Sequence, residues 1–334
     1  MPRRPPAVAR VLTQVTSTVR TRKLLDEGDR VLAMVSGGPD SVCLLYSLWH
    51  LRRLLKIRVE VFHFDHRLRP DSEADGAYVR RVTERLGVPF HLREADDEPK
   101  KGESVEAWAR LRRLQAANGV RREIGANFMA EGHTLDDQAE TVLLNLVRGS
   151  GIEGLSGIDP GDRGSRWIQP LIDVSRADVE AFCRALHLRP RRDPMNRDRR
   201  HLRVAIRLDV LPTIERATGR GARSTLARTA DNLRAARDEL YVATLRAAED
   251  VTDSIDGEIR FDADKLRALT PAMAARVIRS EIYTTLAIME VPWSSAAIDA
   301  VLDLANGRPG RRRDLPNGRT ARRDRTHVIV TRAR

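Results

Sequence analysis

The feature that most restricts the fold of this 334-residue chain is a regular alternation of strand-like and helix-like segments in its first half. Short runs rich in β-branched and aromatic residues alternate with longer runs whose apolar residues recur at helical spacing. The expected strands are residues 31–35, 57–66, 88–95 and 127–133, and the expected helices are residues 7–27, 40–55, 71–86, 103–124 and 135–148. This order predicts an α/β fold with a doubly wound parallel sheet and helices on both of its faces.

The character of the chain changes after about residue 215. A break rich in Gly, Arg and Ser is followed by a long helical pattern over 222–250 and by further helical patterns over 262–306. Near the end, the pair Asn317-Gly318 is a strong signal for a β-hairpin turn. We therefore expect two domains, residues 1–215 and residues 216–334, of which the second is mainly helical and ends in a short β-hairpin.

The charge of the chain favours a polyanionic partner. The sequence has 59 Lys and Arg against 47 Asp and Glu, a formal net charge of +12, which is typical of proteins that bind nucleic acid or an anionic membrane surface. No run of eighteen apolar residues and no signal-peptide pattern occurs, so we expect no membrane span and a cytoplasmic protein. The two cysteines, Cys43 and Cys183, are isolated, form no zinc or CxxC pattern, and fit a reducing compartment.

The loop Ser36-Gly37-Gly38-Pro39-Asp40-Ser41 joins the first expected strand to its helix. Glycine can adopt the positive φ angles that let backbone N–H groups converge on an anion, and the following helix N-terminus attracts negative charge. A carboxylate at Asp40 would repel a phosphate unless a cation such as Mg²⁺ bridges the two. The alternative is an ordinary turn in which Asp40 or Ser41 caps the helix. The residues of this loop alone leave both interpretations open.

Several segments together resemble one enzyme family. The loop Ser36–Ser41 is similar to the pyrophosphate-binding loop of the N-type ATP pyrophosphatases, also called the PP-loop superfamily. Within that group, FDHRLRPDSEAD, EAWARLRRLQAA and especially GHTLDDQAETVLLNLVRGSGIEGLSGI resemble the tRNA(Ile)-lysidine synthetases. RWIQPLIDVSRADVEAFCRAL and RDPMNRDRRHLRVAIR continue the likeness, which is strong over about residues 31–215 and weaker beyond.

The resemblance implies a particular reaction. Enzymes of this family use ATP to adenylate the C2 oxygen of the wobble cytidine in the CAU anticodon of tRNA(Ile), and free L-lysine then displaces AMP. The product, lysidine, switches the tRNA from methionine to isoleucine identity. We therefore expect ATP and Mg²⁺ as cofactors, lysine and this tRNA as partners, and residues 1–215 and 216–334 as the catalytic and tRNA-binding domains. The oligomeric state stays open between monomer and dimer.

Acidic and histidine side chains after the expected strands are the candidate catalytic residues. Asp40 and Asp137 are candidate Mg²⁺ ligands, and Asp136 is either a further ligand beside Asp137 or the cap of the helix that starts at residue 135. His133 would contact a phosphate, assist proton transfer or act as a passive hydrogen bonder. His66, after the second strand, has the same alternatives.

Arginines in the matched segments are the candidate anion-binding residues. Arg110 is expected to bind ATP, because a guanidinium can clamp a phosphate bidentately, although a solvated face of an Arg-rich chain is the alternative. Candidate substrate-binding residues are Arg113, Arg148, Arg203 and Arg207. The glycine-rich segment 148–158 is expected to be a mobile loop that closes over the substrate. Expected contacts to the tRNA backbone are Arg220, Arg223, Arg311, Arg312, Arg313 and Arg319.

The sequence departs from the family pattern at three positions: Arg192 replaces the usual Glu, Val204 the usual Asn, and Thr134 a second His. Two other functions compete with lysidine synthesis. One is tRNA thiolation, which needs reactive or cluster-binding cysteines that this chain does not offer. The other is an RNA-binding protein of the same fold without catalytic turnover.

Overall fold

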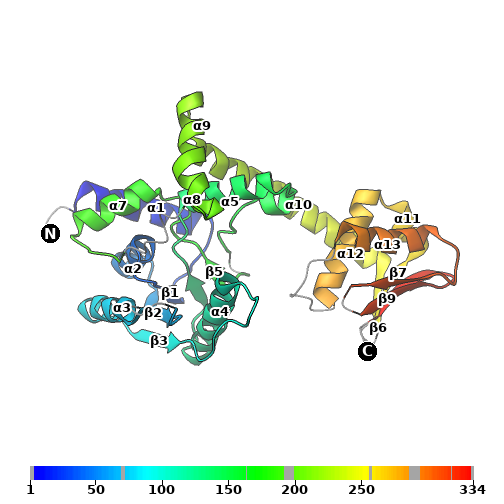
Figure 1. Cartoon of the computed structure of the whole chain (residues 1–334), viewed down its shortest axis with the longest axis horizontal. Helices are drawn as coiled ribbons and strands as arrows, with labels where there is room; N and C mark the ends of the chain where they lie inside the picture. Colours follow the sequence, from blue (N-terminus) through cyan, green and yellow to red (C-terminus); the bar gives the residue numbers. More distant parts are fainter. Residues whose placement is uncertain are drawn as a thin grey trace. The chain divides into compact units, whose positions relative to one another are not determined.

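The computed structural model describes residues 4–68, 72–162, 164–191, 199–255, 258–285, 294–316 and 318–331 (Figure 1). Arg192 and Asn317, named above, lie outside the described residues. The chain divides into two compact units, Met1–Arg234 and Ala235–Arg334, and the division falls inside helix α10 (Ala222–Val251). The predicted boundary at residue 215 precedes this helix, and the functional assignment of the two parts remains a proposal.

The first unit contains the expected parallel sheet, with strand order β3-β2-β1-β4-β5. Its strands are β1 (Arg30–Met34), β2 (Arg58–Asp65), β3 (Phe90–Glu94), β4 (Phe128–Ala130) and β5 (Trp167–Ile168). The chain adds β2 and β3 on one side of β1 and then β4 and β5 on the other. The order therefore reverses between β1 and β4, which is where open α/β sheets bind ligands, beyond the carboxyl ends of the strands.

Helices cover both faces of this sheet, which confirms the doubly wound fold. The first unit contains α1 (Pro6–Thr21), α2 (Pro39–Leu51), α3 (Ser72–Leu86), α4 (Val105–Glu123), α5 (Leu135–Val147), α6 (Ile152–Leu155), α7 (Arg176–Ala185), α8 (Leu202–Ala205), the π-helix η2 (Ile206–Val210) and α9 (Leu211–Thr218). Alternate residues of β1 point to opposite faces: Val31 and Ala33 pack with α1, α2 and α7, whereas Leu32 and Met34 pack with α4. Burial of both faces explains why β1 is continuously apolar.

The second unit has its own core and contains more strands than the sequence predicted. Three of its helices are α11 (Ala263–Ala268), α12 (Pro271–Thr285) and α13 (Ser295–Asn306). Its strands are β6 (Thr252–Ile255), β7 (Glu258–Asp262), β8 (Arg312–Leu315), β9 (Arg319–Arg323) and β10 (His327–Thr331). The predicted terminal hairpin corresponds to β8 and β9, and it belongs to a five-stranded antiparallel sheet in the order β6-β7-β10-β9-β8. Among the described helices, none is long and apolar enough to cross a membrane.

Candidate functional site

The loop from Ser36 to Ser41 leaves β1 at the carboxyl edge of the sheet and leads directly into α2. Gly37 has φ +92°, a conformation that residues with a side chain rarely adopt. Gly38 is the N-cap of α2, and no side chain of the described residues caps the helix. The Ser41 hydroxyl donates to the Gly38 carbonyl at 3.0 Å instead of accepting from a helical N–H. The alternative in which Asp40 or Ser41 caps this helix is therefore wrong, and the first-turn amides stay available for an anion.

Gly132 lets a second loop touch this one. It follows β4, and a Cβ at this position would lie 3.0 Å from the Asp40 carbonyl oxygen and 3.3 Å from the Ser41 amide nitrogen. Because both contacts are with backbone, a larger residue here would push the two loops apart. The sequence analysis did not identify Gly132, which fixes the segment carrying His133 against the start of α2.

Asp40 lies in the first turn of α2 and faces Arg176, the first residue of α7. The distance from Arg176 Nη2 to Asp40 Oδ2 is 3.5 Å. Asp40 Oδ1 is buried and has no hydrogen-bond partner among the residues that the structure describes. Burial, together with the nearby Asp137 and Asp136, raises the pKa of Asp40 to about 6 against the opposing effects of Arg176 and Arg207. No described residue therefore satisfies the second oxygen of this carboxylate.

The N-terminus of α5 supplies the other two aspartates. Thr134 is the N-cap, and it forms a reciprocal capping box with Asp137, whose Oδ2 accepts from the Thr134 amide at 2.9 Å. Asp136 instead accepts from the Arg176 amide at 2.8 Å and pairs with Arg223 Nε at 2.9 Å. The prediction that Asp136 caps this helix is therefore wrong, because the cap is Thr134, one of the three departures from the family pattern.

The second oxygen of Asp137 faces two guanidinium groups. Asp137 Oδ1 lies 3.4 Å from Arg176 Nη2 and 3.8 Å from Arg207 Nη2. Burial alone would raise the pKa of Asp137, but Arg176, His133 and the hydrogen bonds from Thr134 outweigh it and hold the pKa below its usual value. Asp137 is consequently ionised, and Arg176 lies between it and Asp40.

Glu131 connects two further candidates. This carboxylate, which the sequence analysis missed, is 3.5 Å from His133 Nε2 and 3.3 Å from Arg113 Nη2. Burial opposes its ionisation, but His133 and Arg113 together lower the pKa of Glu131 to about 2. His133 and Arg113 therefore belong to one charged cluster at the end of β4. His66 lies after β2, and burial lowers its pKa to about 4, so its ring is neutral at pH 7.

Three predicted anion-binding arginines contact other side chains of the protein. Arg207 donates to both oxygens of Glu140, at 2.5 and 2.8 Å, and the Glu140 side chain has no exposed surface. Arg203 donates to the Thr141 hydroxyl at 2.8 Å. Arg223, expected to contact tRNA, instead pairs with Asp136 and Glu215. These guanidiniums stabilise the packing of α5 against the segment that follows residue 199.

Arg110 and Arg148 are different, because both are exposed and neither has an ion pair among the residues that the structure describes. Arg148 follows the last residue of α5, so about 16 Å of helix separates it from Asp137. The segment after Arg148, predicted to be a mobile loop, has local structure of its own, and its mobility stays a prediction. It contains α6, and Gln138 binds the amide and carbonyl of Ile158 at 2.6 and 3.1 Å.

Comparisons with known proteins agree with this geometry. The PP-loop domain family matches residues 8–214. The tRNA(Ile)-lysidine synthase of Gloeobacter violaceus is 38% identical over 259 residues, which are 77% of each chain. Those of Symbiobacterium thermophilum and Clostridioides difficile are 37% and 32% identical over 92% and 81% of this chain. This chain spans only 66% and 60% of the lengths of those two relatives.

A solved structure shares the fold. The U34-tRNA thiolase NcsA from Methanococcus maripaludis superposes with a TM-score of 0.59 at 18% identity, over 68% of this chain and 78% of that one. The matched domain, the loop at the carboxyl edge of the sheet and the extent of the similarity to Gloeobacter violaceus together show the family. The chain belongs to the PP-loop family and, within it, to the tRNA(Ile)-lysidine synthases.

Proposed function

We propose that this chain joins L-lysine to C2 of the wobble cytidine in the CAU anticodon of tRNA(Ile). In the first step the C2 oxygen attacks the α-phosphorus of ATP and pyrophosphate leaves. In the second step a lysine amine attacks C2, and AMP departs with the oxygen. The observation that carries the proposal is the loop Ser36–Ser41, which leads into α2 without a side-chain cap among the described residues. The loop lies beside Asp137 and Arg176, where the strand order reverses between β1 and β4. The names of the relatives support the same reaction.

A magnesium ion fits the acidic side of this site. The buried Oδ1 of Asp40 has no partner in the described part of the chain, and carboxylate oxygens are the ligands that Mg²⁺ prefers. The described residues contain no group of three or more His, Cys, Asp or Glu side chains placed to hold a metal. That agrees with an ion bound by one or two carboxylates and by substrate phosphates. Asp40 and Asp137 would hold it, and it would neutralise phosphate charge.

The remaining residues then have distinct tasks. The amides of the loop bind pyrophosphate oxygens, and the cluster of Glu131, His133 and Arg113 orients groups at the end of β4. The exposed Arg110 and Arg148 are free to bind ATP and tRNA. Residues 216–334 supply tRNA contacts, including the exposed Arg311–Arg313. A cytoplasmic location belongs to the same proposal, because ATP and tRNA are the substrates.

Transfer RNA thiolation is the main competing function, since the solved structure of similar fold is a tRNA thiolase. At 18% identity that likeness concerns the fold alone. Only two cysteines are present in the sequence, and both are buried. Burial raises the pKa of Cys43 well above its usual value and that of Cys183 to about 12, so neither is a ready nucleophile. This observation favours lysine ligation over sulfur transfer.

The test is ATP-dependent transfer of radiolabelled lysine to an unmodified CAU-anticodon tRNA(Ile). We expect labelling by the wild-type protein, none by Asp40→Ala, and normal labelling by Asp97→Ala, a matched control at a half-exposed carboxylate of the first unit. Binding of tRNA should persist in both variants. Absence of labelling by the wild-type protein would refute the proposed reaction. Full activity of Asp40→Ala would refute only the role of this residue.

A further inference from the structure

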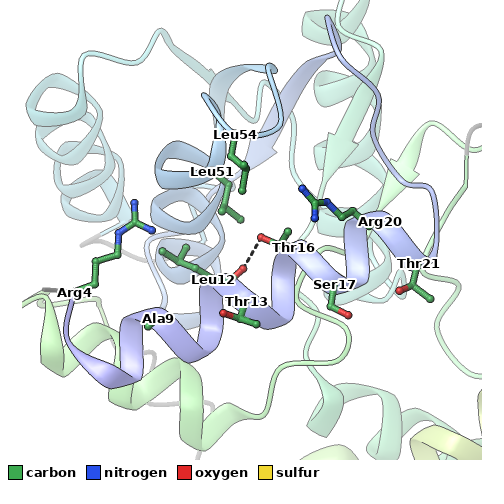
Figure 2. Close-up of a pocket in the computed structure, with 10 residues that line it drawn as sticks. All are labelled: Arg4, Ala9, Leu12, Thr13, Thr16, Ser17, Arg20, Thr21, Leu51 and Leu54. Atoms are coloured by element: carbon green, nitrogen blue, oxygen red, sulfur yellow. Dashed lines mark hydrogen bonds between the residues drawn. The ribbon is translucent and has the colours of Figure 1, made fainter.

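A pocket of about 580 Å³ lies between α1 and the C-terminal end of α2 (Figure 2). Four hydroxyl side chains of α1 and the apolar Leu51 and Leu54 line it. Arg4 and Arg20 stand near the two ends of α1, and Figure 2 shows both side chains extending toward the α2 side of the hollow. Leu51 follows the first residue of α2 by twelve positions, so about 18 Å of helix separates this pocket from the loop Ser36–Ser41.

The two segments that form the pocket contain no acidic residue. Residues 1–25 and 41–59 hold none of the 47 Asp and Glu side chains of the chain, but they hold ten of its Lys and Arg side chains. Burial together with the nearby Arg4 and Arg52 lowers the pKa of His50, which agrees with positive charges gathered on this face. The negative charge that would balance this face must come from outside the two segments.

The carboxylates of the described elements nearby are paired with other cations. Asp178 pairs with Arg10 at 3.1 Å, and Asp173 and Asp231 both pair with Arg22. Glu27 similarly pairs with Lys56 at 2.7 Å. Among the described residues, Arg4 and Arg20, which line the pocket, have no ion pair, and neither do Arg52 and Arg53, which follow the end of α2. Two guanidiniums without an ion pair therefore line the pocket itself.

We propose that this pocket binds the sugar-phosphate backbone of RNA. Guanidiniums and hydroxyls are the groups that contact phosphates, and the lining contains no aromatic residue on which a base could stack. The inference rests on the proposed function, with tRNA as the RNA. Because the pocket lies about 18 Å from the ATP loop, it holds a different part of the tRNA from the base that reacts.

The experiment measures the affinity for unmodified CAU-anticodon tRNA(Ile) by fluorescence anisotropy at several salt concentrations. The pocket variant is Arg4→Gln with Arg20→Gln. The control is Arg93→Gln with Arg112→Gln, which removes the same charge from exposed arginines on β3 and α4. The logarithm of the association constant falls linearly with the logarithm of the salt concentration, and loss of two phosphate contacts should make this slope less steep by about 1.4 to 1.8 in the pocket variant. The control should keep the slope of the wild type.

Lysine transfer provides a second readout. The pocket variant should raise KM for tRNA several-fold and leave kcat and KM for ATP unchanged. Equal slopes for the pocket variant and the control would overturn the inference. It would also be overturned if the pocket variant lost binding to anionic phospholipid vesicles but kept its binding to tRNA. A wild-type protein that transfers no lysine but shows the slope difference would refute the proposed function and leave the RNA site standing.

Discussion

The ion pair between Arg207 and Glu140 gives the sharpest test of whether this arginine serves stability or substrate binding. Glu140 has no exposed side-chain surface, and Arg207 donates to both of its oxygens. In Arg207→Met the carboxylate would remain buried without its main partner, which typically costs about 3–5 kcal/mol. Arg203 Nε, 3.9 Å from Glu140 Oε2, compensates in part, so we expect about 3 kcal/mol.

The free energy of unfolding is measured by urea denaturation. A loss of about 3 kcal/mol in a unit of this size lowers Tm by about 6–12 °C. Burial raises the pKa of Glu140 even with Arg207 present. Without Arg207 the folded state would bind a proton on Glu140 more readily than the unfolded state, so the variant should be less destabilised at pH 5 than at pH 8.

A double variant separates the two explanations. Arg207→Met with Glu140→Leu removes both charges and should recover most of the stability that Arg207→Met alone loses, because an apolar pair of similar size can replace a buried ion pair. If Arg207→Met instead lost less than about 1 kcal/mol and raised KM for tRNA tenfold or more, the structural interpretation would be refuted. Arg207 would then be the substrate-binding residue that the sequence predicted.

Three further predictions concern the site and its surroundings. The pKa of Asp40 is raised to about 6, so the free energy of unfolding should fall as the pH rises from about 4 to 6. Asp40→Asn should remove this pH dependence, which urea titrations at pH 4 and 7 would measure. The variant should also be more stable than the wild type at pH 7 and should transfer no lysine. Gly132→Ala should lower the free energy of unfolding by about 1–3 kcal/mol and weaken ATP binding at least tenfold, as measured by calorimetry. Normal ATP affinity would contradict the close approach of Gly132 to the loop at Asp40 and Ser41. Cys43 and Cys183 should resist iodoacetamide at pH 8 until the protein unfolds, as mass spectrometry would detect; rapid native alkylation would show that the thiols are accessible.

The sheet could be predicted because its sequence signals are local. The strand at Arg30–Met34 is apolar on both faces, and the glycines after it indicate a turn that a helix follows. The cap of α5 was also readable, since Thr134 and Asp137 have the spacing of a capping box. The adjacent aspartates drew attention to metal binding, and the capping role was therefore assigned to the wrong one.

Glu131 and Arg176 could not be identified in this way. Each is an ordinary charged residue in a chain with 59 basic and 47 acidic side chains, and its role depends on partners that folding brings together. Arg176 meets Asp40 although 136 positions separate them, which no local pattern encodes. The strands β6 and β7 were missed for a related reason. They are four and five residues long, and they belong to a sheet because β7 pairs with β10 and β6 pairs with β7.

The capping box of α5 restricts which residues can replace Asp137 in evolution. One oxygen of Asp137 closes the helix through Thr134, and the other faces the guanidinium of Arg176. An asparagine could still accept the capping hydrogen bond, but it would then turn its NH₂ group toward that guanidinium. The helix cap and the guanidinium thus each require an acceptor from one oxygen of the same side chain. A carboxylate supplies both acceptors and an amide does not, so replacement of this residue is restricted by folding as well as by the charge of the site, even in a descendant without catalytic activity.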